Sequence, residues 1–485
     1  MFTLKKGVYM FDEEDDDEQG FDSQFNSELE RYEKMMEDKE VYYFDTEILE
    51  QIIDHFIIKN QLKKALRAIL FALDQHPSNH IFNLRKAQIF STTGKLKESL
   101  LLLQELEKTE PFNIEVYVTK ASVFSQLRDH GKAIKYFEKA LEVAQHHDQA
   151  WEVEDILFDL ALEYENEHDY QNAIKSLEKL LETSPDNESA IYEIAYCYER
   201  IGNFDKCIEF YTRYIDNNPY SFTAWYNLGN IYFLKNNIEK ALWAYDYSVI
   251  INSEFSSAHF NMGNTYMQIN EYQKALESYA KCVEIDGDDA LTLSYLAEAY
   301  ERLERYDEAI EIYEKSKALN DEIAEPWLGI GIIKELTGNR TEAINYLKRA
   351  AELQPENANY RLVLAEALYK EERLIEAEAE LEAALQIEAT YDDAIIMLAK
   401  LKAQFSLDDA IDFMATYENL SQLNLKVRIY FCVLLWQDGQ KTEALHLFKK
   451  EYLIDKNSAK TLFLYLPEAE HIPEFIHILD LDNEQ

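Results

Sequence analysis

The sequence predicts an all-α fold in which one helical hairpin is repeated about twelve times. Three observations indicate it. The 485 residues include only 12 glycines and 8 prolines, about a third of the usual share of these helix breakers. Small residues recur at a regular interval of 34 positions. Hydrophobic residues make up 47% of the chain, which is enough apolar surface for a packed core and excludes global disorder.

Two sets of small residues define the repeat. The first set marks the middle of each predicted second helix and consists of Ala65, Ser99, Ala133, Ala173, Cys207, Ala241, Ala275, Ala309, Ala343, Ala377, Ala410 and Ala444. The second set lies in the predicted first helices, is small at every position except Ile53, and consists of Ile53, Ala87, Ala121, Ala161, Ala195, Gly229, Gly263, Ala297, Gly331, Ala365, Ala399 and Cys432. Helices that cross closely need small side chains at the crossing. The two sets therefore predict a close crossing in every hairpin.

The N-terminal part, residues 1–44, is expected to be a disordered acidic tail. It contains the unbroken acidic run Asp12–Glu18, and such a run repels itself and cannot collapse. Within the tail, a short helix is expected from Leu29 to Met36, leading into the first hairpin. The repeats are expected to occupy residues 45–456.

Two departures from the 34-residue interval are informative. The interval between Ala133 and Ala173 is 40 residues, and the six extra residues, near 141–152, are expected to lengthen two facing helices. The interval between Ala377 and Ala410 is one residue short. Residues 457–485 are expected to form capping helices, because the last repeat of an array needs a polar outer face.

The repeat resembles the tetratricopeptide-repeat (TPR) family. In one repeat the family pattern is carried by Trp225, Leu228, Gly229, Tyr232, Ala241 and Tyr245, and the resemblance covers about residues 45 to 456. It implies a right-handed superhelical solenoid with a C-terminal capping helix, and a concave groove lined by the first helices that binds a peptide or protein. The family is defined by packing residues, so the fold follows from it more directly than the function.

The resemblance also implies where a peptide would bind. Groove-lining side chains fall at the second, fifth, ninth, twelfth and thirteenth positions of each first helix, with the sixth near the edge, when the small residue is counted as the eighth. In repeats five to eight these positions combine aromatics, which give contact area at low entropic cost, with asparagines, which can donate to and accept from one peptide unit. The alternative is that these residues serve packing. The expected peptide-binding residues are Tyr192, Tyr196, Tyr226, Asn227, Asn230, Phe233, Phe260, Asn261, Asn264, Met267 and Tyr295.

The charge of the chain limits its partners. The net charge is −44, from 48 basic and 92 acidic residues, and this field repels nucleic acids and anionic membranes. We expect a neutral to basic protein or peptide, although the acidity could serve solubility alone. Groove acids are expected to be exposed and to favour such a partner; they are Glu165, Glu199, Glu298, Glu301, Glu335 and Glu366. A second expectation is a cationic patch near the C-terminus, made by Lys370, Lys400 and Lys426, that could receive an acidic segment such as Asp12–Glu18; scattered surface lysines are the alternative.

The sequence gives no sign of catalysis, of a metal or of a cofactor. No acid–base pair stands out among the many carboxylates, and the glycines of Gly329–Lys334 fall inside a predicted helix. His146, His147 and Asp148 are expected to be solvated surface and not metal ligands. The four cysteines have no metal-ligand spacing and are expected to be inert core thiols. No membrane-spanning segment or secretory leader is apparent, so we expect a cytoplasmic protein.

The leading hypothesis is therefore a scaffold or adaptor that binds a protein segment in a concave groove. The alternative is a chaperone-like holder of basic client proteins, in which the acidic tail contributes electrostatically. An enzyme would require a domain outside the repeats, and a passive spacer would not need the apolar groove residues Tyr226 and Phe260.

Overall fold

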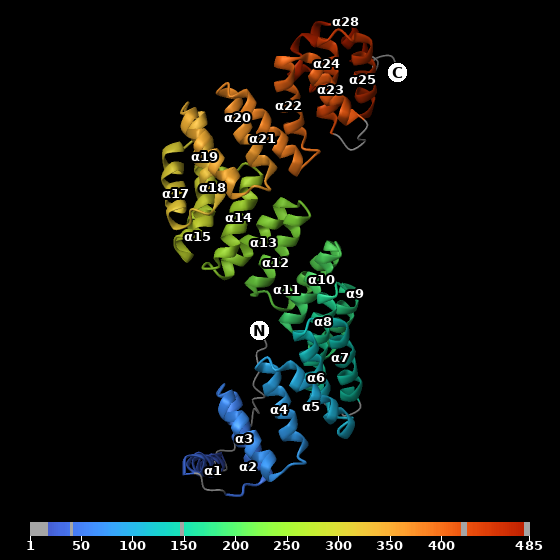
Figure 1. Ribbon diagram of the computed structural model, residues 1–485. Helices are drawn as coiled ribbons and strands as arrows, with labels where there is room; N and C mark the ends of the chain where they lie inside the picture. The colour runs from blue at the N-terminus through green and yellow to red at the C-terminus, as the bar shows by residue number, and fades with distance from the viewer. Residues whose placement is uncertain (1–17, 39–41, 146–149, 419–423, 480–485) are drawn as a thin grey trace. The chain divides into compact units, whose positions relative to one another are not determined.

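A computed structural model describes residues 18–38, 42–145, 150–418 and 424–479 of the chain. These residues form helices joined by short turns and contain no strand (Figure 1). The chain divides into two units, Met1–Asn236 and Asn237–Gln485, and each is described by itself.

The first unit contains one N-terminal helix followed by five hairpins and the first helix of a sixth. Its helices are α1 (Glu18–Asp38), α2 (Thr46–Ile58), α3 (Leu62–Gln75), α4 (His80–Thr92), α5 (Leu96–Thr109), α6 (Ile114–Gln126), α7 (His130–Gln145), α8 (Ala150–Asn166), α9 (Tyr170–Thr183), α10 (Glu188–Arg200), α11 (Phe204–Asn217) and α12 (Phe222–Leu234).

The second unit continues the same alternation and ends in short helices. Its elements are α13 (Ile238–Ile251), α14 (Ser256–Gln268), α15 (Tyr272–Asp286), α16 (Ala290–Arg302), α17 (Tyr306–Leu319), α18 (Ala324–Leu336), α19 (Arg340–Leu353), α20 (Ala358–Lys370), α21 (Leu374–Ile387), α22 (Asp392–Phe405), α23 (Leu407–Glu418), α24 (Leu425–Gln437), α25 (Lys441–Ile454), α26 (Lys456–Ala459), α27 (Leu462–Tyr465), the 3-10 helix η1 (Pro467–His471) and α28 (Pro473–Leu479).

The predicted hairpin repeat is confirmed. Helices α2 to α25 are the twelve pairs that the sequence predicts. All twelve small residues of the second helices have 0% exposure, and the small residues of the first helices are buried as well. The crossing leaves no spare volume, because a Cβ added to Gly331 of α18 would lie 2.6 Å from the Leu347 side chain of α19. The small residues thus permit the close approach of the two helices.

The turns inside eleven of the twelve hairpins have their own recurring feature, a residue with positive φ. In hairpin ten, the Glu372 amide donates to the Tyr369 carbonyl at 3.0 Å and the next amide, of Arg373, donates to the Leu368 carbonyl at 2.9 Å. This is the bonding of a left-handed helix end. The residues with this conformation are Asn60, Gly94, Arg128, His168, Gly202, Asn236, Asn270, Glu304, Gly338, Glu372 and Gly439.

Hairpin eleven differs, and the difference explains its short interval. Only Ser406 separates α22 from α23, and its φ is −153°. The left-handed residue has been lost from this turn, which shortens the repeat by one position.

The N-terminal helix differs from the expectation for the tail. Helix α1 includes the expected Leu29–Met36 helix and extends beyond it at both ends. Its Tyr32 and Met35 are only 3% and 2% exposed and pack against Phe44 and Phe56. The expectation of disorder is therefore wrong for α1, because its apolar residues share one helical face that the acidic composition conceals. The acidic side chains of Asp12–Glu18 lie outside the described residues.

The two ends of the fourth-repeat insertion are visible. Helix α7 has 16 residues and α8 has 17, against 14 in α5 and 13 in α4, the corresponding second and first helices of hairpin two. His146, His147 and Asp148 lie outside the described residues. Near the C-terminus, Leu462 and Phe475 of the short helices, and Leu466 between α27 and η1, are at most 2% exposed and pack in one cluster with Phe448 of the last hairpin.

We expect Glu372→Gly to stabilise hairpin ten. A side chain in the left-handed region costs about 1–2 kcal/mol, whereas glycine loses about 0.5–1 kcal/mol more backbone entropy on folding, so a net gain of up to about 1 kcal/mol remains. Hydrogen exchange of the α20 and α21 amides should slow accordingly. Glu382→Gly, at an exposed position inside α21, is the matched control and should accelerate exchange, since glycine costs about 1 kcal/mol within a helix. Equal effects of the two changes would contradict this account of the turn.

We expect Gly329→Ala to destabilise the second unit. A Cβ on Gly329 of α18 would lie 2.1 Å from Cζ of Tyr313, and Tyr313 is 3% exposed, so the ring must be displaced at a cost of about 1–3 kcal/mol. Thermal unfolding measures the change. Gly131→Ala in α7, where no atom lies within 4 Å of the added Cβ, should be neutral or slightly stabilising. A stability of Gly329→Ala equal to that of the original chain would show that Tyr313 does not require this glycine.

Candidate functional site

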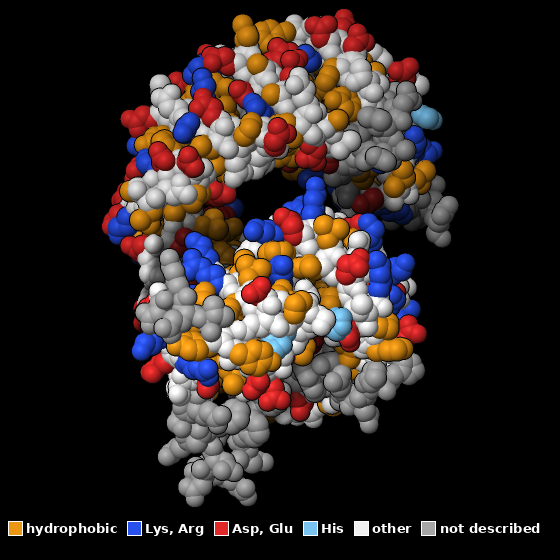
Figure 2. All heavy atoms as spheres, turned by 60° about the horizontal axis from the view of Figure 1, so that its bottom comes forward, with side chains coloured by type: hydrophobic (Ala, Val, Ile, Leu, Met, Phe, Trp, Pro, Cys, Tyr) orange, Lys and Arg blue, Asp and Glu red, His pale blue; other side chains and the backbone are white. Residues whose placement is uncertain are grey.

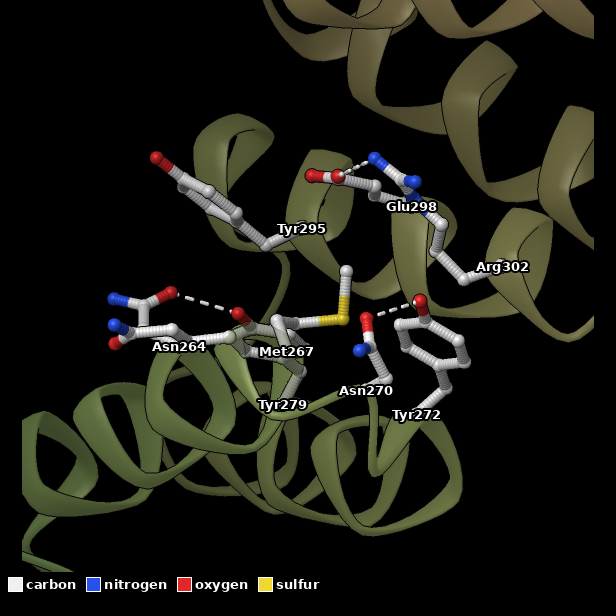
Figure 3. Close-up of a pocket in the computed structure, with 9 residues that line it drawn as sticks. Asn264, Met267, Asn270, Tyr272, Tyr279, Tyr295, Glu298 and Arg302 are labelled. Carbon is white, nitrogen blue, oxygen red and sulfur yellow. Dashed lines mark hydrogen bonds and ion pairs between the residues drawn. The ribbon is translucent and has the colours of Figure 1, made fainter. Parts of the chain in front are cut away.

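A pocket of about 360 Å³ lies in the second unit, where α14, α15 and α16 meet. Three of the eleven predicted peptide-binding residues, Asn264, Met267 and Tyr295, line it together (Figure 3). Asn264 and Met267 come from α14, and Tyr295 faces them from α16. The full lining consists of Asn264, Met267, Gln268, Asn270, Tyr272, Tyr279, Tyr295, Glu298 and Arg302.

Tyr279 of α15 forms the floor of this pocket, and the sequence analysis did not select it. Its side chain is fully buried and passes so close to Gly263 that an added Cβ there would lie 2.5 Å from the ring. Its hydroxyl donates to Oδ1 of Asn264 at 2.7 Å. The bond fixes the orientation of the Asn264 amide and directs its Nδ2 group, a hydrogen-bond donor, away from Tyr279 (Figure 3).

Aromatic packing holds the opposite wall in place. The Tyr295 ring lies 5.2 Å from that of Phe260 in an edge-to-face contact and 5.9 Å from that of Tyr279 in a stacked one. Contacts of this kind restrict both rings. The predicted residue Phe260 therefore supports Tyr295 and is not part of the pocket lining.

The rim of the pocket is polar. Arg302 and Glu298 of α16 form an ion pair at 3.3 Å with side-chain exposures of 53% and 37%, so their mutual attraction is weak. The Tyr272 hydroxyl donates to Oδ1 of Asn270 at 2.6 Å, in the turn between α14 and α15. An apolar floor with a small number of polar groups around it is the usual composition of a ligand pocket.

Glu301, one turn beyond Glu298, is a half-buried carboxyl group. Burial raises its pKa to about 7, against the opposing effect of the hydrogen bond that it accepts from the Tyr313 hydroxyl at 3.0 Å. Tyr313 reaches this carboxylate from α17, across the space left by Gly329. Glu301 is therefore held by the fold and does not project into solvent.

The other predicted residues are placed as follows. Asn261 is half-buried on α14. Six belong to the first unit, and two of these are on α10, where the Tyr192 hydroxyl bonds to Glu188 and Thr223 and Tyr196 is 43% exposed. The remaining four are half-buried on α12 and are Tyr226, Asn227, Asn230 and Phe233. One continuous site over repeats five to eight stays a prediction.

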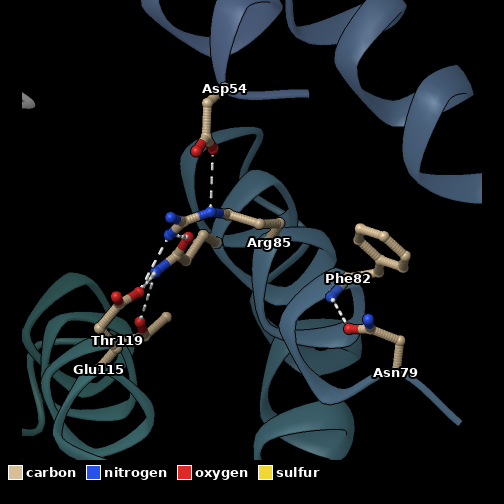
Figure 4. Close-up of polar contacts among 7 residues, drawn as sticks. Asp54, Asn79, Phe82, Arg85, Glu115 and Thr119 are labelled. Carbon is tan, nitrogen blue, oxygen red and sulfur yellow. Dashed lines mark hydrogen bonds and ion pairs between the residues drawn. The ribbon is translucent and has the colours of Figure 1, made fainter. Parts of the chain in front are cut away.

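The first three hairpins use their groove positions for an internal network. Arg85 of α4 binds Asp54 of α2 through Nε at 3.1 Å and Glu115 of α6 through Nη1 at 3.0 Å (Figure 4). Gln88 also donates to Glu115, at 3.1 Å, and to Thr119, at 3.4 Å. These polar groups already bind one another, so the network joins the first helices of the first three hairpins.

The expectation of exposed groove acids is wrong for five of the six. Only Glu366 is exposed. Lys370 donates to Glu335 at 2.9 Å, which also removes one lysine from the expected cationic patch. The Cys197 thiol donates to Glu165 at 3.3 Å, and burial together with the charge of Glu193 raises the pKa of Glu165 to about 7. Side chains of adjacent hairpins thus engage two of these carboxylates, Glu335 and Glu165.

The remaining surface is mixed in character. On the face shown in Figure 2, acidic side chains are interspersed with basic and hydrophobic ones. The four cysteines are free and buried, as expected, and burial raises the pKa of Cys207 to about 12. Over the described ranges, no three His, Cys, Asp or Glu side chains are grouped to hold a metal ion. No helix in the described part of the chain is long and apolar enough to cross a membrane.

Comparison with known proteins agrees with the hairpin architecture. The model of a tetratricopeptide repeat matches residues 114–147 and 154–187, and the model of the cilia and flagella-associated protein 70 C-terminal domain matches residues 187–401. No relative was found among curated protein sequences.

Solved structures also resemble the chain. Yeast Tom70 is 16% identical over 80% of this chain and 95% of its own, with a TM-score of 0.44. A tetratricopeptide repeat protein from Parabacteroides merdae is 18% identical over 52% of this chain and 99% of its own, with a TM-score of 0.43. YrrB, described as a TPR protein with an unusual peptide-binding site, is 21% identical over 38% of this chain and 95% of its own, with a TM-score of 0.31.

The two family models together match more than half of the chain, and the small-residue crossings continue at the same interval on both sides of the matched residues. The chain belongs to the tetratricopeptide-repeat proteins.

Proposed function

We propose that the chain is a protein-interaction scaffold and that the pocket between α14 and α16 receives one residue of an extended partner segment. The observation that carries this proposal is the Asn264 amide, which Tyr279 orients at the edge of an apolar pocket. A fixed donor beside an apolar cavity suits a peptide, because one residue offers both a carbonyl oxygen and a side chain.

The chemistry of the pocket defines the residue that it would take. The Nδ2 group of Asn264 donates to a backbone carbonyl of the partner, while a large apolar side chain contacts Met267 and Tyr295. Aromatic walls provide contact area with little loss of entropy, since their own packing already restricts them. The amide contact is independent of the partner's sequence, so the pocket supplies the selectivity.

The charge of the site favours a neutral to basic partner segment. Glu298 stands at the rim, Glu366 is exposed, and the chain as a whole carries −44. A role as a non-catalytic adaptor in the cytoplasm is part of this proposal and rests on the sequence.

A chaperone-like holder of basic clients is the second candidate, and the net charge is the observation that favours it. A holder that depends on diffuse charge loses affinity steeply between low and high salt, because exposed charges are screened within about 10 Å at 0.1 M. A peptide held mainly by the pocket loses much less.

We expect Asn264→Asp to weaken peptide binding while keeping the fold. The aspartate still accepts the Tyr279 hydrogen bond, but it has no N–H donors and adds a charge that repels a carbonyl oxygen. Peptides selected from a displayed library on the full chain should bind the variant at least about tenfold more weakly. Asn359→Asp is the matched control, because Asn359 accepts a hydrogen bond from Tyr391 at 3.1 Å away from this pocket. Selected peptides that bind the Asn264 variant and the original chain equally would refute the proposal.

We expect Glu301→Gln to stabilise the second unit at alkaline pH only. Since the folded-state pKa is raised to about 7, the protonated form of Glu301 is favoured by folding; its contribution is complete below about pH 4.5 and is lost as pH rises through 7. The unfolding midpoints of the variant and the original chain should therefore agree near pH 5 and separate by pH 8, with the variant higher. Exposed Glu382→Gln should follow the original chain at both pH values. A variant that is less stable at pH 8 would show that the ionised carboxylate is the favoured partner of Tyr313.

A further inference from the structure

Arg200, the last residue of helix α10, is an exposed arginine that carries its charge without a carboxylate beside it. Its Nε group donates to the Tyr170 hydroxyl of α9 at 3.2 Å, and its guanidinium carbon lies 5.8 Å from the centre of the Tyr170 ring. Within the part of the chain that the structure describes, Arg200 forms no ion pair. Its two Nη groups therefore keep their N–H donors for an acceptor from outside.

The equivalent position in two other first helices holds a cation that is paired internally. Arg302 of α16 pairs with Glu298, four residues earlier, at 3.3 Å. Lys370 of α20 pairs with Glu335, 35 residues earlier, at 2.9 Å. Like Arg200, both cations come five positions after the small residue of their helix. The chain thus has two ways to neutralise a cation at this position.

Arg200 has neither of these partners. Tyr196 stands four residues earlier, where α16 has a glutamate. Glu165 stands 35 residues earlier, but it accepts the hydrogen bond of the Cys197 thiol at 3.3 Å. Burial, together with the charge of Glu193, raises the pKa of Glu165 to about 7, so this carboxylate is only partly ionised near neutral pH. The exposed charge of Arg200 is therefore specific to hairpin five.

Aromatic groups hold Arg200 in place and add donors beside it. The Tyr170 hydroxyl that Arg200 contacts also lies 3.1 Å from Nδ1 of His168. The Tyr170 ring meets that of Tyr196 edge-on, with 6.4 Å between the centroids. Both Tyr196 and His168 are exposed. Tyr170 thus gathers a guanidinium, an imidazole and a second phenol around one ring, and we call these four residues the Arg200 cluster.

The acidic groups nearest in sequence leave the positive charge of the Arg200 cluster in place. Asp169 caps α9 and accepts two hydrogen bonds from Asn172, at 3.2 and 2.7 Å. Glu199 is half-buried and Glu167 is exposed, and Arg200 pairs with neither. The net charge of −44 repels anions at long range, but exposed charges are screened beyond about 8 Å at physiological ionic strength. The contacts made at the cluster therefore decide whether an anion binds.

We propose that the Arg200 cluster binds an oxyanion on a partner segment, namely a phosphorylated or a carboxylate side chain. Arginine presents its N–H groups as a planar fork that fits two oxygens of such a group, and the His168 ring and the Tyr196 hydroxyl offer further donors. Because a phosphoryl group has three acceptor oxygens, it uses more of these donors than a carboxylate does. The rest of the segment stays neutral to basic. This site lies in the first unit and does not rest on the α14–α16 pocket.

The test uses the full chain, immobilised, and three random peptide libraries that differ only in one fixed central residue, phosphoserine, glutamate or serine. We expect the chain to retain the phosphoserine library at least about tenfold better than the serine library, because hydrogen bonds to a charged group are strong. Retention of the glutamate library tells the two sources apart. A value between the other two libraries identifies the phosphoryl group as the preferred source, and a value equal to that of phosphoserine identifies the carboxylate.

Two variants and one control localise the effect. Arg200→Gln should lower the phosphoserine-to-serine ratio to about one, because the guanidinium fork is lost. Tyr196→Glu supplies the internal partner that α16 has at this place, so it should occupy Arg200 and lower the ratio as well. Arg213→Gln removes the same charge from an exposed position on α11 of the same hairpin and should keep the ratio of the original chain. Circular dichroism checks that all three variants fold.

Three outcomes would overturn the proposal. Equal retention of the three libraries by the original chain would mean that no oxyanion is recognised. An unchanged phosphoserine preference in Arg200→Gln would place the anion elsewhere. An equal loss of preference in Arg213→Gln would show that the anion responds to overall charge and not to the Arg200 cluster.

Discussion

The close crossing of the two helices in each hairpin is the constraint on which the rest of the structure depends. At every crossing the second helix contributes a fully buried small residue, such as Ala65, Ala275 or Ala444, and side chains larger than these would separate the helices. Bulkier residues one turn further along, for example Leu103, Tyr279 and Phe448, are then buried between the helices. Because every hairpin packs in the same way, hairpins follow one another along the chain and no single central core is needed.

The fold was predictable because the packing solution repeats, and the exceptions have identifiable causes. The crossings recur in sequence at the interval that the structure confirms, and the one-residue shortening before Ala410 corresponds to the missing left-handed residue beside Ser406. Helix α1 was not fully predicted, because composition hides the apolar face on which Tyr32 and Met35 lie. A periodicity argument applied to the tail alone would have found it.

The pocket was less predictable, because its lining comes from more than the first helices. Asn264, Met267 and Tyr295 were predicted from groove positions, but Tyr279 comes from the second helix and determines how Asn264 is oriented. A signal for it was present in the sequence, since tyrosines recur 34 residues apart at Tyr211, Tyr245, Tyr279 and Tyr313. The internal pairs that engage Glu335 and Glu165 had no such signal, because they join residues about one repeat apart whose side-chain directions are set only by the packed structure.

The repeat also indicates where function can vary without cost to the fold. Positions at the crossings carry small residues, with Ile53 the one large exception, so change is concentrated on the surfaces that the crossings leave exposed. Such a surface can be braced, as Arg85 braces the first hairpins, or charged and solvated, as on α15. It can also be apolar, as at Trp243. Since the hairpins repeat at a regular interval, equivalent exposed positions can be compared within one chain. The comparison shows which exposed positions depart from the charged pattern of their neighbours, and these departures are where one hairpin surface differs chemically from the next.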